Sequence, residues 1–128
     1  MGLRWGRILV AAVTVEIAAI ALLVAFVAAI GPKDQEAAAA FAEWLGQWLG
    51  PLAGTVGCFL GGWWASRSMP TRHIVQGAMV GVVAAAIDVA LLLAGGASFR
   101  LLFVASNLAR IIAGGFGGWT ASIRSSRR

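Results

Sequence analysis

Long runs of apolar residues, broken by very few charged side chains, constrain this chain more than any other feature of its sequence. The first run extends from Ile8 to Ile30 and follows Arg4, Trp5 and Arg7. The apolar region of a signal peptide has about 7–15 residues, and this run is longer and carries Glu16 in its middle. We therefore interpret residues 7–30 as a retained membrane-spanning helix.

Composition extends this conclusion to the whole chain. Of its 128 residues, 60% are hydrophobic and 12% charged, against about 45–50% and about 25% in soluble domains. A soluble domain of this length has too little interior to bury so much apolar surface. The sequence predicts one all-α integral membrane domain over residues 1–128, with the lipid bilayer as its solvent. One cysteine excludes a disulfide framework and a thiolate metal cluster.

Three more apolar runs predict membrane spans, at about residues 51–67, 73–94 and 99–123. Gly31-Pro32 ends the first span, and turns follow at residues 69–71 and 95–98. A helix over these ranges needs about 20 residues to cross a bilayer. The sequence thus predicts four transmembrane helices.

Residues 34–48, between the first two spans, predict a short amphipathic helix that lies on the membrane surface. Asp34 can cap its start, and Gly50-Pro51 favours a break before the next span. The alternative is that this segment extends the following helix. One face of the segment is aromatic and apolar, since its large side chains recur at helical spacing: Phe41, Trp44, Leu45 and Trp48.

The basic residues predict the orientation of the spans. Seven arginines fall on one side of the predicted topology, namely Arg4, Arg7, Arg67, Arg72, Arg124, Arg127 and Arg128, and two basic residues on the other, Lys33 and Arg100. The positive-inside rule then places both termini in the cytoplasm of a bacterial-type inner membrane. Trp63 and Trp119 are expected at the inner membrane interface, and Trp44 and Trp48 at the outer one. This distribution accounts for the net charge of +5 without nucleic acid as a partner.

The chain also contains a candidate internal repeat. Residues 61–67 read GGWWASR and residues 117–124 read GGWTASIR, and the helix before each carries one acid, Glu16 or Asp88. This predicts two parallel hairpins related by duplication. The alternative is convergent use of small residues and an interfacial tryptophan.

Glycines four residues apart favour close packing of helices in lipid, where small residues let backbones approach. We expect packing within the bundle, or else a pore lining or a subunit contact in a homo-oligomer. The predicted packing residues are Gly54, Gly57, Gly61, Gly77, Gly81, Gly114 and Gly118.

Three ionisable residues lie deep inside the spans: Glu16, Asp88 and Arg110, with Asn107 one turn from Arg110 on the same face. At 1.5 Å per residue, Glu16 and Arg110 are roughly 18–21 Å from the basic residues that end their helices. Arg110 can reach either acid, which leaves the other without a fixed partner. Burial favours the neutral form of such an acid unless a proton acceptor, a cation or water reaches it. Intramembrane ionisable groups indicate ion or proton pathways.

Two partial resemblances bear on this site. A glutamate midway along the first of four helices resembles the small multidrug resistance transporters, which implies that Glu16 is a shared proton and cation site; those proteins lack acids and arginines matching Asp88 and Arg110. Residues 51–61 resemble a helix of the small fluoride channels, whose Thr-Thr-Phe-Ser run is missing here. Each resemblance covers one helix, so the sequence assigns no family.

We therefore expect a small transporter or channel that moves protons, cations or a small solute through a site made by Glu16, Asp88, Arg110 and Asn107. The alternative is a non-catalytic assembly or accessory subunit of a larger membrane complex. We expect no enzyme, cofactor or metal, because His73 is the only histidine, falls at the bilayer surface and lies on a different predicted helix from Cys58. The sequence names no substrate.

Overall fold

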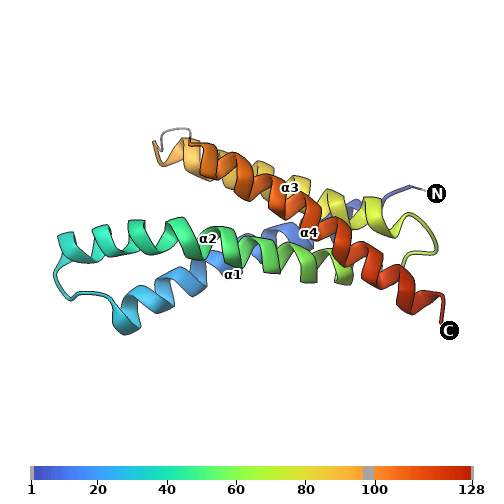
Figure 1. Cartoon of the computed structure of the whole chain (residues 1–128), viewed down its shortest axis with the longest axis horizontal. Coiled ribbons are helices and arrows are strands. Elements are labelled where there is room, and N and C mark those ends of the chain that lie inside the picture. The colour runs from blue at the N-terminus through green and yellow to red at the C-terminus, as the bar shows by residue number, and fades with distance from the viewer. Residues whose placement is uncertain (1, 97–99, 128) are drawn as a thin grey trace.

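The computed structural model describes residues 2–96 and 100–127 and contains four α-helices packed as a bundle (Figure 1). They are α1 (Trp5–Ile30), α2 (Gln35–Ser66), α3 (His73–Ala94) and α4 (Leu101–Ser125). Helices α1, α3 and α4 are long and apolar enough to cross a membrane. The prediction of an all-α, multi-pass membrane protein is confirmed at this level.

Helix α2 differs from the prediction, because the expected surface helix at residues 34–48 and the expected span at 51–67 form one continuous helix. Asp34 caps its start as predicted, since its carboxylate accepts a hydrogen bond of 3.0 Å from the Ala37 N–H. Pro51 lies inside the helix. The residue before a proline normally leaves the helical region because its Cβ clashes with the ring, and Gly50 has no Cβ. The Thr55 hydroxyl donates to the Pro51 carbonyl at 2.7 Å.

The two ends of the bundle differ in charge and in shape. Both termini and the turn at residues 67–72 lie at one end, which we call the arginine end (Figure 1). The turn at residues 31–34 and the end of α3 lie at the other, which we call the cleft end. In Figure 1 the α1–α2 pair and the α3–α4 pair diverge toward the cleft end and come together toward the arginine end.

Glycines allow the helices to approach closely in the half of the bundle nearer the arginine end. A Cβ at Gly77 of α3 would meet the Gly114 carbonyl of α4, and one at Gly81 would meet the Arg110 carbonyl. A Cβ at Gly117 would meet the Phe59 carbonyl of α2, and one at Gly118 the His73 carbonyl. Backbone thus lies directly against backbone, which maximises dispersion contacts where lipid supplies no hydrophobic force.

Alanine and branched aliphatic side chains, with one cysteine, fill the remaining core between α1, α2 and α3. One cluster contains Ile8, Ala11, Ala65 and Val80, and the next, closer to the middle of the bundle, contains Ala12, Val15, Cys58 and Ala84. Gly57 and Gly61 of α2 face the Val15 side chain of α1. The free thiol of Cys58 is fully buried and serves as one of these small fillers.

Candidate functional site

Arg110 of α4 joins carboxylates from two other helices at the centre of the bundle. Its Nη1 forms a short ion pair with Oε1 of Glu16 on α1, and its Nη2 lies 3.4 Å from Oδ1 of Asp88 on α3. The exposed fraction of the side chain is 3% for Arg110, 7% for Glu16 and 21% for Asp88. The three residues form a buried charged cluster to which three helices contribute.

The sequence left open which acid Arg110 contacts and predicted that the other would have no partner. That second expectation is wrong, because one guanidinium contacts both carboxylates. The reason lies in its geometry: the planar group presents two Nη atoms in a fixed fork, so it can serve two acceptors at once.

Gly54 of α2 leaves the space that the Arg110 side chain occupies. A Cβ at Gly54 would lie 2.5 Å from Nε and Nη2 of Arg110 and 2.6 Å from Cζ. The atoms nearest to Gly54 on this side therefore belong to the Arg110 side chain of α4. Arg110 Nε is buried and, among the described residues, has no hydrogen-bond partner.

Asn107, the fourth predicted site residue, does not join the cluster. Its Nδ2 donates to the Phe103 carbonyl one turn earlier at 2.9 Å. Its side chain lines a separate groove of about 260 Å³ between α3 and α4, together with Val89, Leu93 and Leu108. The Asn107 Nδ2 group is satisfied by this local backbone acceptor and makes no hydrogen bond to either carboxylate among the described residues.

A cleft of about 730 Å³ opens beside the cluster, between the α1–α2 pair and the α3–α4 pair. Glu16, Asp88 and Arg110 lie in its lining, together with apolar residues of all four helices such as Leu23, Leu91 and Phe103. Its other lining residues extend to Gly95 and Gly96 at the end of α3. The cleft therefore connects the buried charges with the cleft end.

Three polar residues of this cleft were not predicted from the sequence as site residues: Glu43, Gln47 and Arg100. Glu43 and Gln47 are one helical turn apart on α2 and line the cleft, whereas Trp44 and Trp48 beside them are 58% and 62% exposed. Two polar side chains of the segment predicted to lie on the membrane surface therefore line the cleft. The signal was the i, i+4 spacing of the two polar side chains, opposite the aromatic stripe.

The charges of the lining do not balance. Glu16, Glu43 and Asp88 supply three carboxylates, and Arg100 and Arg110 two guanidiniums. If all are ionised, the lining carries one net negative charge. A concave site with apolar walls focuses that field, so the arrangement favours a proton or another cation over an anion.

The remaining candidate chemistry is limited. Within residues 2–96 and 100–127, no group of three or more His, Cys, Asp or Glu side chains is placed to hold a metal ion. His73, the first residue of α3, is buried within the bundle, and its carbonyl accepts a hydrogen bond of 2.9 Å from the Ser66 hydroxyl. Comparison of the chain with models of protein families, with curated proteins and with solved structures found no match.

Proposed function

We propose that this chain is a small membrane transporter that moves a proton or a small cation by way of the Glu16–Arg110–Asp88 cluster. The observation that carries this proposal is the position of the cluster. Two carboxylates share one guanidinium at the inner limit of a cleft that is open at one end of the bundle. Ionisable groups buried this deeply are costly in a membrane protein and are typical of ion and proton pathways.

The charge balance of the cluster defines its proposed chemistry. With all three groups ionised, two negative charges face one positive charge, so the cluster accommodates one further proton or one monovalent cation. Asp88 is the more exposed acid and has the longer contact with Arg110. We propose that Asp88 exchanges the proton or cation with the cleft, and that Glu16 holds Arg110 in place.

The shape of the bundle supports a transport cycle of the alternating-access type. The cleft is open toward one end, and the close backbone contacts of Gly77, Gly114, Gly117 and Gly118 lie nearer the other. We propose that the described structure is the state open at the cleft end. Many transporters switch states by rocking one helical unit against another around a central site; here the two units are the α1–α2 and α3–α4 hairpins, which we propose arose by duplication.

Reconstitution into liposomes tests this function. Proton flux is followed with an internal pH-sensitive dye under an imposed potassium diffusion potential, and sodium and potassium uptake are measured in parallel. We expect Glu16→Gln and Asp88→Asn each to lower the flux of the transported cation at least tenfold. Glu36→Gln is the matched control, since Glu36 is exposed in the first turn of α2 and does not line the cleft. Flux by the Glu16→Gln/Asp88→Asn double variant at the wild-type rate would contradict the proposal.

We further propose that α2 is the fourth span, that both termini are cytoplasmic, and that the protein is a non-enzymatic component of a bacterial-type inner membrane. The support is that the start of α1, which carries Arg4 and Arg7, and the turn at residues 67–72, which begins and ends with an arginine, lie together at the arginine end. Single cysteines placed at Ser126 and at Lys33, in a Cys58→Ala background, test the orientation. An impermeant thiol reagent added outside intact cells should label position 33 and leave position 126 unlabelled.

A second candidate function is that of an accessory subunit of a larger membrane complex. A homo-oligomer would use the same kind of surface. A specific feature favours it: an exposed apolar groove of about 610 Å³ between α2 and α4, lined by Phe59, Ile112, Phe116 and Trp119 among others. Such a groove fits a transmembrane helix of another subunit. Cross-linking in native membranes to a stoichiometric larger partner, with no flux from the purified chain, would favour this function over transport.

A further inference from the structure

Several arginine side chains converge around the end of α2, at the arginine end of the bundle. Arg4 Nη1 donates to the Ser68 hydroxyl at 3.3 Å, and Arg7 Nη1 donates to the same oxygen. Arg7 Nη2 donates to the Trp64 carbonyl at 2.6 Å. Arg67, next to Ser68 in the chain, lies over the Trp63 ring. Two guanidiniums therefore meet at one hydroxyl, with a third adjacent.

These positive charges have no acidic counterpart nearby. The five acids of the chain are Glu16 and Asp88 in the central cluster and Asp34, Glu36 and Glu43 toward the cleft end. Among the described residues, the ion pairs are those of Arg110 alone. Arg7 Nε is also buried without a hydrogen-bond partner in the described part of the chain. Like charges held together in this way favour a bound anion.

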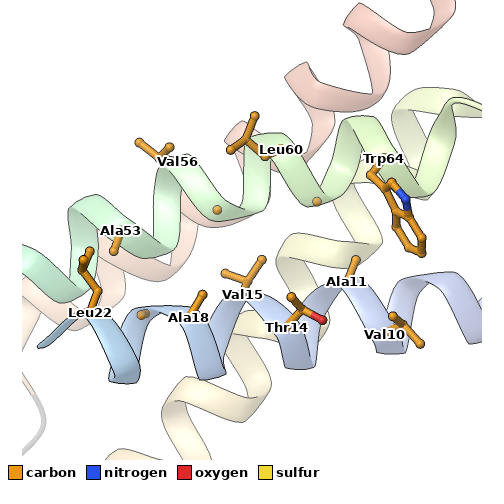
Figure 2. Close-up of a pocket in the computed structure, with 13 residues that line it drawn as sticks. Val10, Ala11, Thr14, Val15, Ala18, Leu22, Ala53, Val56, Leu60 and Trp64 are labelled. Atoms are coloured by element: carbon orange, nitrogen blue, oxygen red, sulfur yellow. The ribbon is translucent and has the colours of Figure 1, made fainter. Parts of the chain in front are cut away.

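An apolar groove of about 570 Å³ begins beside this cluster and follows the seam between α1 and α2 (Figure 2). Small residues line much of it, and larger aliphatic side chains border it. Along α1 it extends from Val10 to Leu22, about 18 Å at 1.5 Å per residue. One leaflet of the hydrocarbon core is about 15 Å thick. The groove therefore has the length of a lipid acyl chain.

Trp64 connects the groove to the arginines. Its side chain lines the groove near the arginine end (Figure 2). The Arg7 guanidinium lies 4.4 Å from the centroid of the same ring. The positive cluster therefore lies next to one end of the apolar groove. A phospholipid has the same arrangement, with a charged headgroup at one end of its acyl chain.

We propose that this composite surface is a binding site for an anionic phospholipid. The phosphate contacts Arg4, Arg7 and Ser68, with Arg67 at its edge, and one acyl chain lies in the groove between α1 and α2. Charge complementarity selects the lipid over a transmembrane helix of a second copy. A copy in the same orientation would bring its own arginines to the same level and repel these. The site is separate from the central cleft and does not depend on the proposed transport function.

Native mass spectrometry of the full chain in detergent tests the proposal by titration with phosphatidylglycerol and with phosphatidylcholine of the same acyl chains. We expect phosphatidylglycerol to bind at least tenfold more tightly. Arg4→Gln and Arg67→Gln should each weaken phosphatidylglycerol binding about fivefold, the ratio that corresponds to about 1 kcal/mol per basic residue near anionic lipid. Arg127→Gln, at an exposed position of the C-terminal turn, is the charge-matched control and should leave binding unchanged.

We expect Arg4→Gln to leave the fold intact, because the contacts of Arg4 with Gln76 do not involve the arginine side chain. The structural contacts of Arg4 with Gln76 use backbone atoms: its N–H donates to Gln76 Oε1 at 3.0 Å, and its carbonyl accepts from Gln76 Nε2 at 3.1 Å. A second variant tests the apolar groove between α1 and α2. Ala18 is exposed and lines this groove, so Ala18→Leu should fill it and weaken phosphatidylglycerol binding at least threefold. Ala25→Leu, exposed on α1 outside the groove, is the control.

Three results would overturn the proposal. The first is equal affinity for the two lipids. The second is binding of inorganic phosphate that competes fully with phosphatidylglycerol and is insensitive to Ala18→Leu, which would assign the arginines to a free anion. The third is a lipid-independent dimer that Ala18→Leu dissociates, which would assign the groove to a second copy.

Discussion

The sharpest test of the central cluster is a substitution at a residue that carries no charge, Gly54→Ala. The Cβ that it adds would lie 2.5 Å from Nε and Nη2 of Arg110. Ordinary contacts between such atoms begin at about 3.5 Å, so the guanidinium must move by about 1 Å. The Nη2–Asp88 distance is already 3.4 Å, near the limit of a hydrogen bond, so a movement of that size alters the contact.

The magnitude follows from two opposing effects. Overpacking a well-packed interior costs about 1–3 kcal/mol, and complete loss of a buried ion pair would cost about 3–5 kcal/mol. The helix gains about 1 kcal/mol when alanine replaces glycine. Gly46→Ala on the same helix provides the same gain without the clash, because a Cβ there meets only Cδ2 of Leu23, at an ordinary contact distance of 3.6 Å. We expect Gly54→Ala to be less stable than Gly46→Ala by about 1–3 kcal/mol.

A double-mutant cycle assigns the cost to Arg110. Unfolding in mixed micelles of increasing SDS content, followed by tryptophan fluorescence, gives the free energy for each variant. The cycle compares Gly54→Ala in the native chain and in a charge-free background of Glu16→Gln, Asp88→Asn and Arg110→Met. If the guanidinium is what the new Cβ meets, its removal should abolish most of the penalty. An equal penalty in both backgrounds would refute the reasoning.

Further predictions concern the same contacts. Glu16→Gln should lower the free energy of unfolding by more than Asp88→Asn, by about 1 kcal/mol or more, because Glu16 is the more buried partner of Arg110; the same SDS titration measures it, and the reverse order would contradict the assignment. Asn107→Leu should leave cation flux in liposomes within twofold of wild type, since Asn107 lies outside the cleft; a tenfold loss would return Asn107 to the site. Gly114→Ala should cost at least about 2 kcal/mol, because its Cβ would meet the Gly77 carbonyl, which cannot rotate away as a side chain can; a neutral result would show that α3 and α4 separate at little cost.

Much of the fold could be predicted from the sequence because lipid imposes simple rules. A long apolar run must form a helix in a membrane, where every backbone polar group needs an internal partner. The bounds of α3 at His73 and Ala94 match the predicted range. The continuity of α2 through Pro51 could not be derived in the same way, because it depends on a local detail that weighs against the usual effect of a proline, the missing Cβ of Gly50.

The site was only partly predictable, for a geometric reason. Ionisable side chains are costly in hydrocarbon, so Glu16, Asp88 and Arg110 could be recognised as candidate site residues without knowledge of the helix packing. Which of them meet depends on helix rotation, and the pattern of a helix that is apolar on all sides does not fix its rotation. Gln47 and Glu43 were overlooked because a polar face on an amphipathic helix is ordinarily assigned to water. Here it lines an internal cleft.

The cluster also explains how α4 can be stable in the membrane. A central arginine costs about 2.5–3.5 kcal/mol on the insertion scale, and each large apolar residue returns about 0.3–0.6 kcal/mol. Helix α4 has a mean hydropathy of 1.4 over its most apolar window, compared with 2.7 for α1 and 2.3 for α3. The cost of placing Arg110 in the membrane is offset by its ion pair with Glu16, which is 94 residues earlier in the chain. Because the partner of Arg110 lies on the first helix, α4 gains its full stability only when packed against the completed α1–α3 unit. The charges proposed to move a cation are therefore also the charges that hold the last helix in place.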